Sequence, residues 1–226
     1  MNCFFTNRQN GVSQGPHKSL NLALHVGDSS EDVAKNREIL SKKAGTTNLV
    51  FMDQIHSDNI ETITNKATNR VLKTDGIITN IKDIALCVMV ADCIPILFYD
   101  ETKKVIAAAH AGRDGVRQKI ANKLIQKMVK EFSCKVKDIK VYIGPSIKSC
   151  CYEVKNDVTD GFEKYLIFRG KKIYLDIVQK CIDDIKEIGV KEENIETSSV
   201  CTCCDKDYFS YRRDGKTGRF CGVIVL

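Results

Sequence analysis

The chain has 226 residues, of which 43% are hydrophobic, so it can bury a substantial core as one domain. With three prolines and no linker-like tract, we expect a single domain over residues 1–226. The formal net charge is +6, but the lysines are scattered and no nucleic-acid motif accompanies them, so we expect no nucleic-acid partner. No stretch approaches the ~20 apolar residues of a membrane span, and the first residues do not resemble a signal peptide, so we expect a cytoplasmic protein without a membrane partner.

The chain contains eleven cysteines, an odd number that fits poorly with a complete set of disulfides. In a reducing compartment such thiols are core residues, metal ligands or catalytic groups. Cys87, Cys134 and Cys181 lie among apolar or amphipathic residues, which is typical of buried thiols.

The first half of the chain predicts one helix followed by buried strands. The segment 28–31 has the capping side chains of a helix start, apolar residues then follow at helical spacing, and Gly45 marks the end. The apolar runs predict strands over residues 48–54, 85–90, 94–99 and 105–109. A polar turn at residues 100–103 joins the last two, which indicates a hairpin.

The second half mixes helices and strands. Apolar residues repeat every four positions from residue 116 to residue 128, which predicts one helix that begins just after residues 112–115. We further predict a strand over 139–143, a helix around Val158, Phe162 and Tyr165, a helix that uses Leu175, Val178, Ile182 and Ile185, and a buried final strand. Strands outnumber helices and include hairpins, so the pattern favours a mixed α+β fold.

Three residues of the predicted strands and loops have the chemistry of a site. His56 follows the strand over 48–54, Cys93 lies between two apolar runs, and His110 ends the next run. Zinc accepts imidazole nitrogen and thiolate sulfur, and three protein ligands leave a position open for water or substrate. A water bound there has a pKa near ~7. Asp92, beside Cys93, is a candidate to orient a ligand or to carry a proton.

The same residues permit other interpretations. Cys93 is a candidate nucleophile with His110 as its base, and the sequence does not separate a ligand from a nucleophile. In the simplest alternative, His56 is a surface loop residue and His110 a hydrogen-bonded strand end. A site that binds zinc without catalysis is a third alternative.

Two further segments are candidate sites. Residues 208–219 combine aromatic residues with Arg212 and Arg213, and guanidinium groups suit phosphate or carboxylate. A solvated basic hairpin is the alternative. Cys201, Cys203 and Cys204 are candidates for a second metal site with the Cys150-Cys151 pair, and a loop of reduced thiols is the alternative.

Eight motifs occur in an order that spans nearly the whole chain. They are Asn21-Leu22 through Gly27-Asp28, Gln54-Ile55-His56, Thr74-Asp75-Gly76-Ile77-Ile78-Thr79, Ala91-Asp92-Cys93-Ile94-Pro95, His110-Ala111-Gly112, Ile143-Gly144-Pro145-Ser146-Ile147, Cys151-Tyr152-Glu153-Val154 and Phe209-Ser210-Tyr211-Arg212-Arg213. With these motifs the chain resembles the laccase-domain family, also called the polyphenol oxidase or purine nucleoside phosphorylase family.

The resemblance implies a four-layer α/β/β/α sandwich with mixed sheets, similar to the catalytic domain of the cytotoxic necrotizing factor toxins. It implies Zn²⁺ held by His56, Cys93 and His110. It also implies phosphorolysis of adenosine, inosine, guanosine and methylthioadenosine, with phosphate as co-substrate, and hydrolytic deamination of adenosine. Because the related toxins are cysteine hydrolases, and some relatives are linked to peptidoglycan precursor editing, a Cys-His hydrolase or amidase remains the alternative.

We expect the catalytic residues to be His56, Cys93, His110 and Asp92. The expected substrate contacts are Arg113, Arg212, Arg213 and Asn21.

One motif departs from the pattern of the family. The family usually has His-Ala-Gly-Trp-Arg-Gly, whereas this chain has Arg113 and Asp114 in place of Trp-Arg. The change leaves the metal ligands intact and affects the stacking or anion contact expected of this loop. Classical laccase chemistry is excluded by counting, because four histidines cannot supply a mononuclear and a trinuclear copper centre built chiefly from imidazoles.

Overall fold

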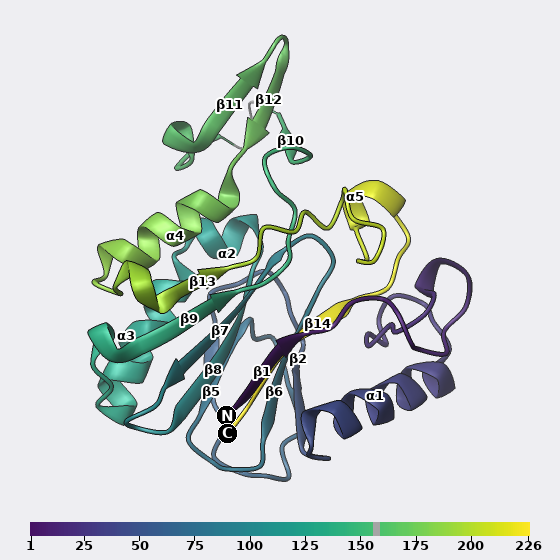
Figure 1. Ribbon diagram of the computed structural model, residues 1–226, viewed down its shortest axis with the longest axis vertical. Helices are drawn as coiled ribbons and strands as arrows, with labels where there is room; N and C mark the ends of the chain where they lie inside the picture. Colours follow the sequence, from purple (N-terminus) through teal and green to yellow (C-terminus); the bar gives the residue numbers. More distant parts are fainter. Residues whose placement is uncertain (156–158) are drawn as a thin grey trace.

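The computed structural model describes residues 1–155 and 159–226 and stacks two β-sheets face to face between layers of helices (Figure 1). The five-stranded sheet has the order β1 (Asn2–Phe5), β14 (Phe220–Val225), β6 (Ala85–Val90), β2 (Leu49–Met52) and β4 (Arg70–Val71). The six-stranded sheet has the order β13 (Ile195–Thr197), β9 (Ile139–Ile143), β7 (Ile94–Asp100), β8 (Val105–Ala111), β5 (Gly76–Thr79) and β3 (Ile60–Thr62).

Both sheets mix parallel and antiparallel neighbours. In the first, β2 runs parallel to β6 while β14 runs antiparallel to it. In the second, β7 and β8 form the expected hairpin, whose register pairs Pro95 with His110. This register brings the turn before β7 next to the end of β8.

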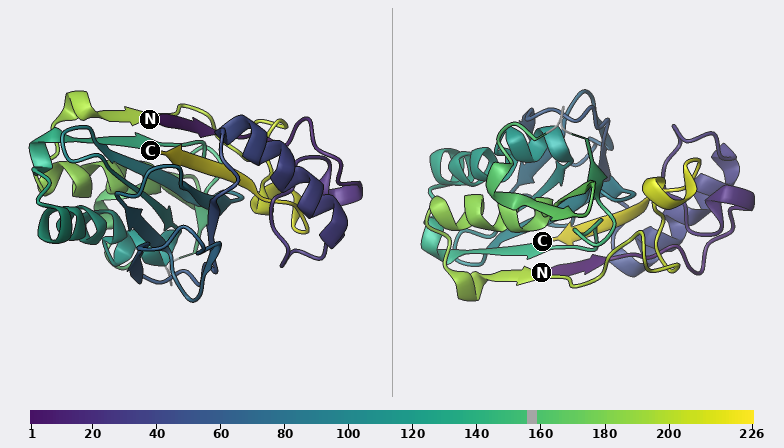
Figure 2. Two further views of the ribbon diagram at one scale, coloured as in Figure 1. Left: turned by 90° about the horizontal axis from the view of Figure 1, so that it is seen from below. Right: turned by 90° about the horizontal axis from the view of Figure 1, so that it is seen from above.

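Helices cover the outer face of each sheet (Figure 2). Helix α1 (Ser30–Ala44) packs on the five-stranded sheet, and α2 (Arg113–Arg117), α3 (Ile120–Phe132) and α4 (Ile177–Glu187) pack on the six-stranded sheet. Three apolar clusters fill the interfaces between successive layers, one between the sheets and one under each helical layer. The expected α/β/β/α arrangement with mixed sheets is confirmed.

Shorter elements complete the described chain. They are η1 (Gly15–His17), η2 (Val136–Asp138), η4 (Glu163–Tyr165), η5 (Glu192–Asn194), α5 (Tyr211–Asp214), and a small antiparallel sheet of β10 (Glu153–Val154), β12 (Lys172–Leu175) and β11 (Leu166–Arg169). Among the described residues, no helix has the length and apolar character needed to span a bilayer.

Several local predictions are confirmed with their physical causes. Ser29 caps α1 by accepting a hydrogen bond from the Asp32 amide, and Gly45 ends the helix in a left-handed conformation. The run over 85–90 is β6, buried along its whole length. The strand over 139–143 and the final strand are also present.

Two helix predictions were wrong. The helix predicted from residue 116 to residue 128 is divided into α2 and α3, because Lys119 adopts a positive φ between them. The apolar positions still lie on one buried face, so the periodicity survives the break. Around Phe162 and Tyr165 there is only the 3-10 turn η4, followed by the unpredicted β11–β12 hairpin. Val158 lies outside the described residues. Leu175 ends β12, two residues before α4 begins.

Candidate metal centre and adjoining pocket

The fold brings His56, Cys93 and His110 together at one edge of the two sheets. His56 lies in the loop after β2, Cys93 in the turn between β6 and β7, and His110 near the end of β8. One potential ligand atom from each lies within 4.8 Å of those of the other two. The Cys93 Sγ is 3.9 Å from the His56 Nε2, and the two imidazoles meet edge to face with their centroids 4.8 Å apart. These side chains are therefore close enough to share one metal ion.

Asp75, which the sequence analysis did not single out, holds both histidines in place. Its carboxylate is fully buried and accepts a 2.8 Å hydrogen bond from the His110 Nδ1. It also accepts bonds from the backbone amides of Ile55, His56 and Ser57 and from the Ser57 hydroxyl. One carboxylate thus fixes the imidazole on β8 and the loop that carries the other imidazole. Because its Nδ1 is engaged, His110 presents its Nε2 to Cys93 or to a metal.

Asp75 could have been noticed only through its motif. Thr74-Asp75-Gly76 precedes the buried strand β5. Its hydrogen bonds reach residues 18–20 positions earlier and 35 positions later, and no local sequence pattern encodes such a network.

The charges in this group reinforce one another. Burial raises the pKa of the Cys93 thiol, but the His110 imidazolium and hydrogen bonds from both histidines outweigh this effect and lower it to about 6. Burial lowers the pKa of His110, but the Cys93 thiolate and the bond to Asp75 raise it to about 9. Burial also raises the pKa of Asp75, and its hydrogen bonds bring it down to about 2. In the absence of metal, Cys93 and His110 therefore form a thiolate–imidazolium pair at neutral pH.

The backbone around the group is tightly fitted. His56 and Asp92 both have a positive φ, an uncommon conformation that clusters at functional sites. A Cβ placed on Gly112 would lie 2.8 Å from the His56 Cδ2 and 3.2 Å from the Cys93 Sγ. Position 112 therefore requires glycine for close approach.

A pocket of 210 Å³ opens beside Cys93. Its walls include Arg113, Tyr152, Tyr211 and Arg212. The Nε of Arg113 is buried and has no hydrogen-bond partner among the described residues, so it is an available donor. A larger hollow of 880 Å³ lies over α1 and β2, but none of the three ligand candidates lines it. The small pocket is therefore the one that the chemistry of this group can reach.

Asp92 lines the same pocket but is occupied. It is 8% exposed, and its carboxylate accepts hydrogen bonds from the Thr202 hydroxyl at 2.7 Å and the Arg212 backbone amide at 2.6 Å. These bonds tie α5 and the loop at residue 202 to the turn that carries Cys93. These contacts favour the orienting role expected of Asp92, and its role in proton transfer stays a prediction.

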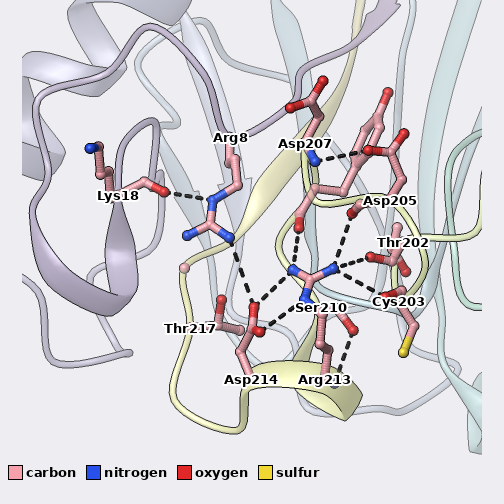
Figure 3. Close-up of polar contacts among 12 residues, drawn as sticks. Arg8, Lys18, Thr202, Cys203, Asp205, Asp207, Ser210, Arg213, Asp214 and Thr217 are labelled. Carbon is pink, nitrogen blue, oxygen red and sulfur yellow. Dashed lines mark hydrogen bonds and ion pairs between the residues drawn. The ribbon is translucent and has the colours of Figure 1, made fainter.

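Arg213 and Asn21 are also engaged within the protein. Arg213 donates to the carbonyls of residues 202, 203, 205 and 208, and both of its remaining interactions are with the Asp214 carboxylate (Figure 3). The side chain of Asn21 is fully buried and bonds to Ala23, Asp28 and the Arg219 amide. In this structure both side chains hold loops together, and their contact with substrate stays a prediction.

Arg212 remains at the pocket. Its Nη1 donates to the carbonyls of Cys151 and Glu153, and its guanidinium lies 5.2 Å from the centre of the Tyr152 ring.

Similarity to known proteins agrees with this architecture. A family described as multi-copper polyphenol oxidoreductase laccase matches residues 2–226. A purine nucleoside phosphorylase of Corynebacterium glutamicum is 39% identical over 98% of this chain and 93% of its own length. The purine nucleoside phosphorylase YlmD of Bacillus subtilis is 34% identical over 98% of this chain and 87% of its own length.

Solved structures give the same result. The hypothetical protein YfiH of Bacillus licheniformis superposes with a TM-score of 0.95 at 32% identity, over 99% of this chain and 92% of the other. YlmD of Geobacillus stearothermophilus superposes with a TM-score of 0.92 at 31% identity, over 99% and 90%. The fold and the site define an α+β protein with a His–Cys–His group of candidate metal ligands. The chain belongs to the laccase-domain family.

Proposed function

We propose that this protein is a zinc-dependent purine nucleoside enzyme. The proposed reactions are phosphorolysis of adenosine, inosine, guanosine and methylthioadenosine, and hydrolytic deamination of adenosine. Full-length relatives that bear the name purine nucleoside phosphorylase support the substrate class. The observation that carries the proposal is the convergence of His56, Cys93 and His110 beside a pocket with an available arginine donor.

The ligand group suits zinc. Two imidazoles and one thiolate form a borderline-soft set of three ligands, and a hydrogen bond like the one that His110 donates to Asp75 is typical of the histidine ligands of zinc. Four histidines remain too few for the copper centres of a laccase, whatever the family's description. When bound, zinc would supply a Lewis acid that activates water and polarises substrate oxygen or nitrogen near neutral pH.

For phosphorolysis, the side chains of the pocket have distinct roles. A phosphate oxygen attacks the anomeric carbon of the ribose while the bond to the base breaks. The available Nε of Arg113 is placed to bind the anionic phosphate. Tyr152 and Tyr211 provide aromatic faces against which a purine can pack. In this proposal Arg113 takes over the anion contact of the arginine that the family usually has one position later.

For deamination, water attacks the purine carbon that bears the amino group, and ammonia leaves. Asp75 and Asp92 keep the surrounding groups in position, Asp75 through the histidines and Asp92 through α5. A closed scaffold of this kind holds reacting groups at fixed distances, which lowers the entropic part of the barrier.

A second candidate is a Cys-His hydrolase or amidase that acts on a small amide or a peptidoglycan precursor. The low pKa of Cys93 and the raised pKa of His110 favour it, because a thiolate beside an imidazolium is a ready nucleophile. The two candidates differ in their need for metal. A covalent Cys93 adduct in active, metal-free protein would favour the hydrolase.

Chelation tests the proposal. Phosphorolysis of inosine should disappear when zinc is removed and return when zinc is added. The His56→Ala variant should show no activity after zinc is added. His25→Ala is the matched control, since His25 lines the other hollow and should keep its activity. Full activity in the metal-free protein would contradict the proposal.

A further inference from the structure

Four cysteines outside the His56 group converge on one point. Cys150 and Cys151 come from the segment after β9, and Cys201 and Cys204 from the loop after β13. One Sγ from each lies within 4.8 Å of the others. We propose that these four thiols, the four-cysteine cluster, bind a structural Zn²⁺ ion that joins the two loops.

The distances fit four ligands of one ion better than a disulfide. The Cys204 Sγ is 3.6 Å from the Cys150 Sγ and 3.3 Å from the Cys151 Sγ. A tetrahedral zinc with Zn–S bonds of ~2.3 Å separates its sulfurs by ~3.8 Å, whereas a disulfide requires ~2.05 Å. All four cysteines are unpaired. Tetrahedral coordination by four thiolates is a closed arrangement of structural zinc sites, with no position left for substrate.

Lys148 lies near the cluster. The Lys148 Nζ is buried and has no hydrogen-bond partner among the described residues. The opposite charges around it come first from Asp176 and then from Cys201 and Cys150. Four thiolates around Zn²⁺ have a net charge of −2, which would add to the carboxylate in compensating this buried amine.

The four-cysteine cluster is accessible to an ion from solvent. Cys150 and Cys204 are exposed, while Cys201 is buried, so an ion can enter from solvent and find a ligand anchored in the fold. Binding a divalent ion releases the thiol protons and involves no change of oxidation state.

The zinc would stabilise the wall of the small pocket. Arg212 donates to the carbonyls of Cys151 and Glu153. Arg213 donates to carbonyls of the loop that carries Cys201 and Cys204, as Figure 3 shows. The segment after β9 also carries Tyr152, which lines the pocket. The loop after β13 contacts Asp92 through the Thr202 hydroxyl. An ion that links the loops therefore fixes several of the pocket's side chains at once.

The test uses metal content and needs no activity. Protein carrying His56→Ala and Cys93→Ser lacks the first ligand group, and elemental analysis should still find one zinc per chain. Adding Cys151→Ser and Cys204→Ser should remove that zinc and lower the melting temperature. Adding Cys203→Ser, a neighbour outside the cluster, should do neither. Cobalt in place of zinc should give the visible absorption of tetrahedral thiolate coordination.

Three results would overturn the proposal. The first is a His56→Ala, Cys93→Ser protein that contains no zinc after expression with zinc present. The second is zinc that persists after Cys151→Ser and Cys204→Ser. The third is an intact mass that has lost two hydrogens, which would indicate a disulfide in the cluster. None of these results bears on the proposed purine nucleoside activity, so the two proposals fail separately.

Discussion

Asp75 offers the sharpest test of the geometry around His56, Cys93 and His110. Asp75→Asn preserves the size of the side chain but replaces one acceptor oxygen with a donor that faces other donors. The native pKa falls from 3.8 to about 2, which corresponds to ~2.4 kcal/mol of stability at ~1.36 kcal/mol per unit. We expect the variant to lose ~2 kcal/mol at neutral pH and 10–100-fold in zinc affinity, the typical effect of losing an orienting partner.

The pH dependence has a definite sign. Because folding depresses the pKa of Asp75, its contribution is present above about 3.8 and is lost as the pH falls through about 2. Urea unfolding at pH 7 and pH 3 should show a smaller difference between wild type and Asp75→Asn in acid. Zinc affinity is measured by chelator competition in Cys204→Ser protein, to remove the second proposed ion. Ser57→Ala, which removes one hydroxyl donor to the same carboxylate, is the control and should have a milder effect. Equal stability and equal zinc affinity in Asp75→Asn and wild type would refute the reasoning.

Four further predictions concern the same site. Cys93→Ala should fold, as judged by circular dichroism, and be inactive, whereas a purely structural zinc module predicts that it unfolds. Gly112→Ala should lower zinc affinity at least tenfold in chelator competition, because its Cβ would lie too close to the His56 ring. Unchanged zinc affinity would contradict this prediction, because the loop would then move enough to accept the Cβ. Arg113→Ala should raise the KM for phosphate more than the KM for inosine in steady-state assays, and an equal rise in both would remove Arg113 from phosphate binding. In metal-free protein, peptide-resolved alkylation of Cys93 should increase with a midpoint near pH 6, and a midpoint near the usual thiol pKa would contradict the ion pair.

The regular elements were predictable where local chemistry and burial agreed. Helix α1 begins after Ser29 and ends at Gly45, as predicted, because an N-cap and a left-handed C-cap each depend on a single residue. β6 is a continuous apolar run that can only be buried. The break at Lys119 was not predictable, because lysine has no special preference for positive φ and the apolar period continues across it. The β11–β12 hairpin carries an apolar pattern that suits a helix as well as a strand.

The convergence of the three candidate ligands was predictable, and the residues that support them were less so. His56, Cys93 and His110 were expected at the ends of neighbouring strands, and the hairpin register brings the last two together. Arg213 was predicted to contact substrate because a guanidinium has the same donors whether it binds phosphate or loop carbonyls, and its carbonyl contacts appear only in the folded loop. Asp75 was missed because its partners come from segments distant in sequence.

The most direct test of the central claim is to incubate the purified, zinc-loaded protein with adenosine, with and without phosphate, and to identify the products by mass. A catalytic centre at His56, Cys93 and His110 predicts adenine and ribose 1-phosphate when phosphate is present, and inosine when it is absent. Adenosine recovered unchanged under both conditions would contradict the account.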